Sequence, residues 1–196
     1  MRDLLTLKNI IWNIPNKQKE IFLTFDDGPN PSTTEFILEC LDKYNAKATF
    51  FCIGKNVEKY PQLFEAILKG GHTIGNHTYN HLKGWKCSLQ EYIDDVQLAS
   101  KFIESNLFRP PYGQISFSQA KVLHRTYKIV FWSVLTWDFK IKIEPSRCLD
   151  NTSLKTKMGD IIVFHDSTKA FHKVEHVLPV FVSRFKELGY SFEAIK

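Results

Sequence analysis

The sequence lacks the features that would place this chain outside the ordinary globular class. It has no run of five or six like charges, no low-complexity segment, no internal repeat and no Gly-rich phosphate loop, so no organic cofactor is indicated. Its apolar fraction of 43%, with 24% charged residues, excludes a disordered or membrane-spanning chain. A length of 196 residues therefore predicts one domain with a packed core.

Cysteine is also scarce, and none of the four cysteines forms a Cys-x-x-Cys pair. This spacing gives no support for a thiolate zinc site or a dithiol redox motif. We expect reduced, mostly buried thiols in a cytoplasmic protein, with two disulfides as the alternative. The formal charge of +5 is spread along the chain without a basic stripe, which predicts no nucleic-acid partner.

Short β-rich runs alternate with longer stretches of helical period. Continuous apolar composition predicts buried strands at residues 21–25, 48–53, 129–132 and 161–164. Apolar residues at three-and-four spacing predict crossover helices at residues 33–44, 89–105 and 174–188. The alternation, repeated some six or seven times, predicts an α/β fold whose parallel sheet is either open or closed into a barrel.

The first 19 residues contain an apolar stretch that is too short and too interrupted to cross a membrane or act as a signal peptide. Residues 4–14 predict a short helix that either plugs the barrel or rests on a membrane surface, and we prefer the first. We expect residues 1–19 to be an extension packed on the barrel and residues 20–196 to be the catalytic domain. We expect a cytoplasmic protein, with a peripheral membrane contact as the alternative.

Ionisable residues follow five expected strand ends, which lie at Phe25, Gly75, Phe108, Trp132 and Phe164. In a parallel barrel the chemistry collects at the carboxyl ends of the strands, so these residues predict one shared site. They are Asp26 and Asp27, His77 and His81, Arg109, Asp138, and His165.

Two of these groups are informative by spacing alone. His77 and His81 are four residues apart and lie on one face if this segment is helical, where with one carboxylate they could bind a metal. A helix cap and an exposed side chain are the alternative. Asp26 and Asp27 stand before Gly-Pro, a common turn, but adjacent carboxylates after an apolar strand are costly unless a cation holds them.

Three motifs in order resemble the polysaccharide deacetylase family, which carries the chitooligosaccharide-deacetylase homology domain. They are Thr24-Phe25-Asp26-Asp27-Gly28-Pro29, His77-Thr78-Tyr79-Asn80-His81 and Arg109-Pro110-Pro111-Tyr112-Gly113. The resemblance runs from about residue 21 to the end of the chain. It implies a distorted (β/α) barrel, usually with seven parallel strands, and removal of an N-acetyl group from an N-acetylated sugar.

The later motifs depart from the family pattern. Where the family shows Asp, two residues and then Asp-Trp, this chain keeps Asp138 but has Leu135 and Phe139 at the other two positions. The last motif, normally Leu-x-His, begins with Val163 and ends with His165. These departures bear on the shape of the acetyl pocket more than on the chemistry.

The resemblance implies that Asp27, His77 and His81 bind one divalent metal, zinc in first place and cobalt or nickel as alternatives. It implies that Asp26 is the general base that takes a proton from the attacking water. Arg109 would orient Asp26 and keep it ionised, since an adjacent guanidinium lowers a carboxylate pKa.

The resemblance also assigns the other half of the reaction. His165 would protonate the leaving amine, with Asp138 hydrogen-bonded to it so that the imidazolium is favoured. The backbone N–H of Tyr112 would stabilise the oxyanion of the tetrahedral intermediate.

Aromatic and apolar side chains near the motifs are candidates for substrate contacts, because aromatic faces bind the apolar side of a sugar ring. The candidate set is Trp85, Pro111, Tyr112, Trp137, Phe139 and Val163. Core packing is the alternative for the aromatic residues, and we prefer it for Trp132.

Two other functions remain open at this point. The same framework could remove a formyl group from a lipid-linked sugar or hydrolyse a non-sugar amide, since Phe139 and Val163 leave room for that. The chain could also be an inactive carbohydrate-binding relative. A mere binder would have no physical reason to keep the full set of base, metal ligands and acid, which favours the enzyme. The oligomeric state does not follow from one chain.

Overall fold

A curled parallel sheet is the centre of the computed structural model, which describes residues 9–196. Eight strands follow one another across the sheet in the order β1-β6-β5-β4-β3-β2-β8-β7, and β9 pairs with β2 off this path. Every strand pairing is parallel. The strands are β1 (Ile10–Ile11), β2 (Glu20–Asp26), β3 (Ala48–Cys52), β4 (Thr73–Asn76), β5 (Leu107–Phe108), β6 (Lys128–Val130), β7 (Val134–Leu135), β8 (Ile161–His165) and β9 (Ser191–Phe192).

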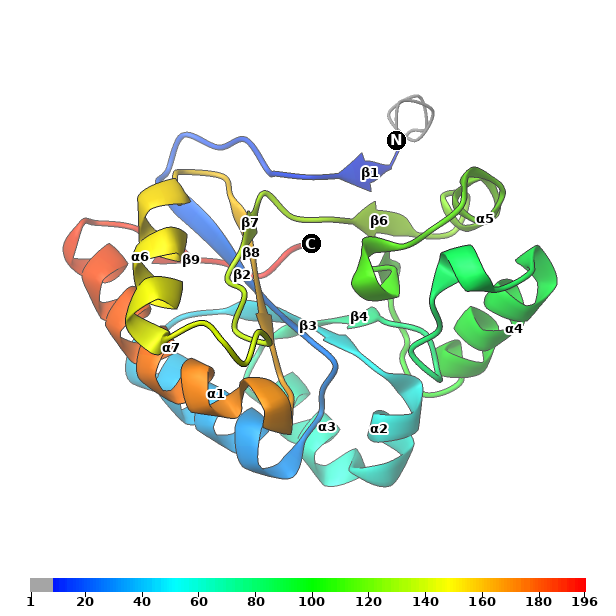
Figure 1. Cartoon of the computed structure of the whole chain (residues 1–196), viewed down its shortest axis with the longest axis horizontal. Coiled ribbons are helices and arrows are strands. Elements are labelled where there is room, and N and C mark those ends of the chain that lie inside the picture. Colours follow the sequence, from blue (N-terminus) through cyan, green and yellow to red (C-terminus); the bar gives the residue numbers. More distant parts are fainter. Residues whose placement is uncertain (1–8) are drawn as a thin grey trace.

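Helices cover the outside of the curved sheet (Figure 1). The α-helices are α1 (Pro31–Lys43), α2 (Gly54–Lys59), α3 (Pro61–Lys69), α4 (Leu89–Ser100), α5 (Phe117–Leu123), α6 (Pro145–Lys155) and α7 (Thr168–Glu187). Two short 3₁₀ turns, η2 (Gly84–Lys86) and η3 (Pro111–Gly113), lie in the connections. The predicted α/β class with a parallel sheet is confirmed, and the sheet forms a half-barrel.

The segment before β2 lies across the open side of the half-barrel (Figure 1). Ile10 pairs with Ile129 of β6, and further along the Ile14 N–H donates to the Gly159 carbonyl just before β8. The expectation of a helix over residues 4–14 is wrong for Ile10–Ile11, which form a strand; residues 1–8 lie outside the described part. The expected seven strands are one too few, because β1 adds an eighth to the path.

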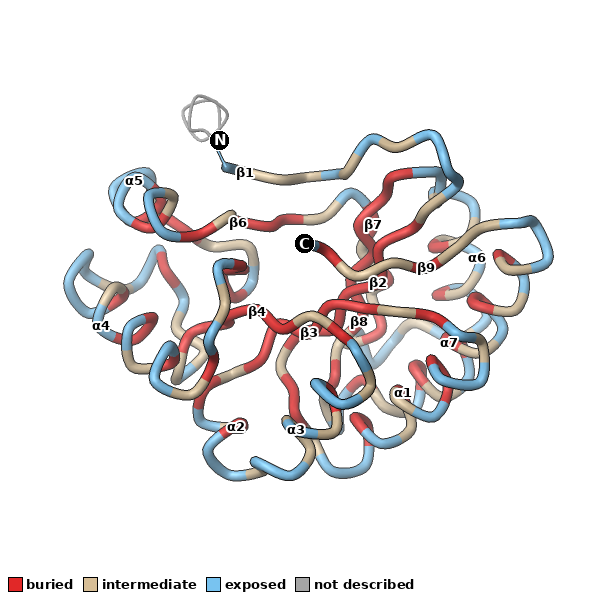
Figure 2. The backbone as a smooth tube through the Cα atoms, turned by 180° about the vertical axis from the view of Figure 1, so that it is seen from behind, coloured by how far each residue is buried: buried red, intermediate tan, exposed pale blue. Residues whose placement is uncertain are grey.

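The strands carry the buried part of the molecule, and the outward sides of the helices are exposed (Figure 2). All five residues of β3 are buried, as expected for a strand covered on both faces. Phe25 of β2 stacks on Phe50 and Phe164 from the two neighbouring strands, with ring centroids 5.1 and 5.8 Å apart. This aromatic layer fixes the spacing of the three central strands whose ends bear the polar residues.

The cysteines agree with the expectation of reduced thiols. All four are free; Cys40, Cys52 and Cys148 are buried and Cys87 is partly exposed. Among residues 9–196, no helix combines the length and apolar composition needed to cross a membrane.

Candidate metal and catalytic site

A cavity of about 760 Å³ opens where the carboxyl ends of the central strands meet. Strand ends of a parallel sheet place their side chains at one edge, which is why residues distant in sequence line it together. The lining residues are Asp26, Asp27, His77, His81, Tyr112, Trp132, Leu135, Trp137, Phe139, Val163, His165, Ser167 and Lys169.

The floor of the cavity holds a buried ion pair between Asp26 and Arg109. Arg109 Nη1 lies 2.7 Å from Asp26 Oδ1, and the guanidinium is fully buried. Its other N–H groups donate to Thr24 Oγ1 and to the carbonyls of Val130 and Phe131, at 2.7 to 3.1 Å. A planar fork bonded to two carbonyls, a hydroxyl and a carboxylate cannot rotate, so Arg109 holds Asp26 in one orientation.

Asp27 points instead toward the two histidines of the second motif. Asp27 Oδ1 lies 3.1 Å from His81 Nε2 and 3.6 Å from His77 Nε2. One ligand atom from each of the three residues lies within 4.8 Å of the other two. Burial opposes the charged form of Asp27, but the neighbouring imidazoles of His77 and His81 outweigh burial and lower the pKa of this carboxyl.

The chemistry of this donor set fits a divalent metal such as zinc. His77 Nδ1 lies 2.7 Å from the Arg109 carbonyl, so Nδ1 carries the proton and Nε2 keeps a lone pair facing Asp27. Two imidazoles and one carboxylate leave coordination positions open for water and substrate. Asp27, His77 and His81 are therefore the residues that would hold the ion.

The histidine pair does not lie on a helix, although its four-residue spacing would suit one. The segment is a loop in which Thr78 and His81 have φ of 62° and 57°. Asp95 of α4 accepts hydrogen bonds from the backbone N–H groups of Tyr79 and Asn80, both at 2.9 Å. This buried carboxylate fixes the loop that brings the imidazoles together, a role that no local sequence pattern indicates.

His165, at the end of β8 beside Asp26, is held by Asp138. His165 Nδ1 lies 2.7 Å from Asp138 Oδ1, and the His165 backbone N–H donates to Asp138 Oδ2 at 2.7 Å. Burial lowers the pKa of His165, but the charge and hydrogen bond of Asp138 outweigh it, and the pKa rises to about 9. The imidazolium is therefore the stable form near neutral pH. Asp138 engages Nδ1, so Nε2 is the ring nitrogen left to serve the cavity that His165 lines.

Tyr112 lies at the cavity mouth, on the 3₁₀ turn η3. Its φ is 59°, its ring centroid lies 4.6 Å from that of His81, and 55% of the residue is exposed. The hydrogen bonds of the turn are donated by the N–H groups of Gly113 and Gln114.

The predicted substrate-contact residues divide into two groups. Phe139, Val163, Tyr112 and Trp137 line the cavity; Pro111 is buried outside the lining, and Trp85 lies outside it with 68% of its surface exposed. Trp132 is partly buried and packs against the hydrophobic core, as expected, and it also lines the cavity.

Several residues of the site carry no signal in a single sequence. Ser167 and Lys169 line the cavity from the start of α7, immediately after the His165 motif. Asp166 lies beneath them: its Oδ2 accepts from Thr34 Oγ1 at 2.6 Å, and burial raises its pKa to about 7. The position of Asp166 beside His165 is the one hint the sequence contains.

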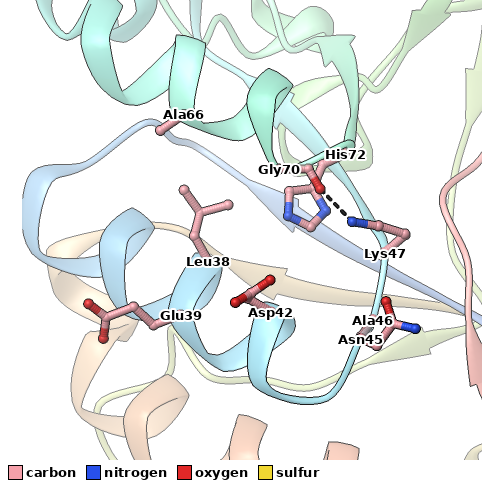
Figure 3. A pocket seen from close by; sticks show the side chains of 9 residues that line it. All are labelled: Leu38, Glu39, Asp42, Asn45, Ala46, Lys47, Ala66, Gly70 and His72. Atoms are coloured by element: carbon pink, nitrogen blue, oxygen red, sulfur yellow. Dashed lines mark hydrogen bonds between the residues drawn. The ribbon is translucent and has the colours of Figure 1, made fainter.

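Two other polar groups lie outside this cavity. His172, Glu175 and His176 form an exposed cluster on α7 with metal-ligand spacing. His72 lies in a separate hollow between α1 and α3 with Lys47 and Asp42 (Figure 3). Burial and the Lys47 charge lower the pKa of His72 to about 4, so this histidine is neutral near pH 7.

Fold and site together define an α/β half-barrel protein with a candidate metal site at the carboxyl edge of its sheet. The family described as polysaccharide deacetylase matches residues 13–127. A peptidoglycan-N-acetylglucosamine deacetylase of Bacillus cereus is 35% identical over 196 residues, covering 95% of this chain and 91% of that one. The chain belongs to the polysaccharide deacetylase family.

Solved structures agree with this assignment. The Bc1960 peptidoglycan N-acetylglucosamine deacetylase superposes with a TM-score of 0.87 at 30% identity, covering 95% of this chain and 91% of that one. BA3943 of Bacillus anthracis, described as a CE4 family pseudoenzyme, has a TM-score of 0.82 at 26% identity and covers 94% and 66%. The family thus includes deacetylases and at least one pseudoenzyme, so membership alone does not decide activity.

Proposed function

We propose that this chain is a metal-dependent hydrolase that removes the N-acetyl group from a sugar residue of a glycan and releases acetate and a free amine. The proposal extends to this chain the substrate named for its relatives, N-acetylglucosamine in peptidoglycan. The observation that carries it is the convergence, around one cavity, of the Asp26–Arg109 pair, the Asp27–His77–His81 set and the His165–Asp138 pair.

Asp27, His77 and His81 would hold a divalent metal, which when bound would supply Lewis-acid chemistry for an acyl carbonyl and for the attacking water. Asp26 lies next to this set in the chain and is held in place by its contact with Arg109. Its carboxylate takes the proton of the water that attacks the acetamide carbon. Because Arg109 Nη1 occupies Asp26 Oδ1, the proton goes to Oδ2.

His165 supplies the proton that the leaving amine needs. With a pKa of about 9, it is protonated at neutral pH and can donate from Nε2 while Asp138 holds Nδ1. The amine then leaves as a neutral group. A positioned acid of this kind raises the rate of C–N cleavage by about 10²–10⁴-fold. The backbone N–H of Tyr112 is the protein donor for the developing oxyanion.

An apolar wall receives the acyl methyl group. Leu135, Val163, Phe139 and Trp132 are apolar residues of the cavity lining. A methyl group gains from burial there, by about 0.8 kcal/mol per carbon. This wall favours an acetyl over a formyl group, which has no methyl to bury.

Chelator-sensitive release of acetate tests the proposal. We expect N-acetylated glycan fragments to release acetate, the activity to disappear with a chelator, and zinc or cobalt to restore it. Metal stoichiometry is measured on the wild type and on His77→Ala/His81→Ala, with His172→Ala/His176→Ala as the control that removes the exposed cluster on α7.

The outcomes separate the candidate functions. Formate release without acetate release would replace the proposed reaction with deformylation. Tight glycan binding with metal present but no hydrolysis of any acyl group would assign the chain to the inactive relatives. Full activity of the His77→Ala/His81→Ala variant would refute the metal site.

A further inference from the structure

Three lysines lie in the lining of the cavity or next to its aromatic residues. Lys169, at the start of α7, lines the cavity itself. Lys83 and Lys140 reach it through aromatic residues of the lining: Lys83 Nζ lies 4.8 Å from the Tyr112 ring centroid, and Lys140 Nζ lies 3.9 Å from that of Trp137. We call these three residues the lysine rim.

The rim is placed close to the reacting groups. The ring of Tyr112, under Lys83, lies 4.6 Å from the ring of His81, so one ammonium is a single aromatic layer away from the metal ligands. Trp137, under Lys140, contacts Phe139, and Phe139 meets His165 edge-on at 4.9 Å. Charge on the rim is therefore within reach of groups that flank a sugar bound over the cavity.

Cation–π contacts orient these side chains without consuming their hydrogen-bond donors. An ammonium over a ring face keeps its N–H groups free to meet an anion, and the ring restricts the motion of the long side chain. The same contacts place a cation over a face of Tyr112 and of Trp137. Those faces are then less suited to stacking on a neutral sugar than to presenting positive charge.

The positive charge of the rim is not compensated. Within residues 9–196, none of the three lysines forms an ion pair. The carboxylates that line the cavity are Asp26 and Asp27, and both are engaged, by Arg109 and by the histidine pair. An acidic group on the substrate would be the missing partner.

We propose that the lysine rim is a binding site for carboxylate groups of the substrate, and that this chain prefers a carboxylate-bearing glycan over a neutral one. The inference rests on the proposed deacetylase function and narrows its substrate class. A carboxylate on a sugar substituent or a peptide branch next to the reacting N-acetylglucosamine would meet one of the ammonium groups. A neutral N-acetylated oligosaccharide would leave all three unpaired.

The test uses one glycan in two charge states. Soluble peptidoglycan fragments with free carboxyl groups are compared with the same fragments after amidation of those groups, for acetate release and for binding. The wild type should favour the free-carboxyl form by roughly tenfold in kcat/KM and in affinity at low ionic strength, since each exposed pair contributes about two- to fivefold. The preference should shrink as salt screens the charges.

Variants connect the preference to the rim. Lys83→Gln/Lys140→Gln/Lys169→Gln should lower kcat/KM for the free-carboxyl fragment several-fold more than for the amidated fragment. The arginine variants at the same positions should keep the preference. Lys59→Gln is the matched control, because Lys59 Nζ lies 4.9 Å from the Tyr60 ring centroid in a similar contact outside the cavity lining.

Equal binding and turnover of the two fragments by the wild type would overturn the inference while leaving the deacetylase function standing. An equal loss on both fragments in the glutamine variant would do the same, because it would indicate a role in packing. Charge-dependent, rim-dependent binding without any acetate release would support the lysine rim and refute the proposed reaction.

Discussion

Replacing Asp138 with Asn should change the protonation of His165 more than any other single substitution in the site. Asp138 contributes the charge and the hydrogen bond that overcome the burial of His165 and raise its pKa from the model-compound value of 6.5 to about 9. A rise of that size corresponds to about 3 kcal/mol in favour of the imidazolium. Asn keeps the shape and can still accept from Nδ1 but has no charge, so burial then dominates and the pKa falls.

Two measurements would detect the lowered pKa of His165. Titration of the His165 ring by NMR in metal-free protein should show a pKa near 9 in the wild type and a much lower value in Asp138→Asn. In the active enzyme the general acid must be protonated, so the alkaline limb of kcat/KM should move to lower pH in the variant. Asp150→Asn is the control, since Asp150 is an exposed aspartate on α6.

The free energy of unfolding of the metal-free protein should depend on pH through the same His165–Asp138 contact. Because the folded-state pKa of His165 is raised, the stabilisation from its contact with Asp138 is fully present below pH 6.5 and is lost as the pH rises toward 9. Urea unfolding of the wild type and of Asp138→Asn should therefore differ most at pH 6 and least above pH 9. An unchanged His165 titration in the variant would show that Asp138 does not control this histidine.

Two further substitutions test the supports of the site. Arg109→Met leaves Asp26 buried without a counter-charge, and we expect a loss of about 3–5 kcal/mol in the free energy of unfolding, measured with urea; a loss below 1 kcal/mol would contradict the buried ion pair. Asp95→Ala frees the loop that carries His77, so metal affinity measured by calorimetry should weaken about 10–100-fold, while the exposed neighbour Asp94→Ala should not change it.

The strands and their polar ends were predictable because they are local features. A run such as Ala48–Cys52 is apolar except at Thr49 and buried throughout, as expected for a strand covered on both faces. The neighbouring helices instead place apolar residues at three-and-four spacing. Once parallel strands are expected, their ends must share an edge. The sequence therefore predicts that Asp26, Arg109 and His165 lie at one edge of the sheet.

The features that sequence reasoning missed depend on contacts between distant segments. The two-residue strand β1 exists because Ile10 meets Ile129 and because Trp12 stacks on Phe131 with ring centroids 4.2 Å apart. Read alone, the same residues resemble an interrupted helix.

The conformation of the second-motif loop, residues 77–81, also depends on contacts with a distant segment. Four-residue spacing suits a helix, but hydrogen bonds to Asp95, from a helix further along the chain, hold Thr78 and His81 at positive φ instead. The spacing predicted that the imidazoles meet, and only the tertiary structure decides how.

Adjacent Asp26 and Asp27 receive different partners because the backbone turns between them. Asp26 is the last residue of β2 and its side chain meets Arg109, whereas Asp27 has a φ of 80° and turns toward His81. Asp26→Asn should therefore leave metal affinity close to that of the wild type and reduce kcat by about 10²–10⁴-fold, the contribution of a positioned base. Asp27→Asn should weaken metal binding itself, and excess metal should restore part of its activity but none of that of Asp26→Asn. If both variants lost metal equally, the two carboxylates would be joint ligands and the division of labour between them would be wrong.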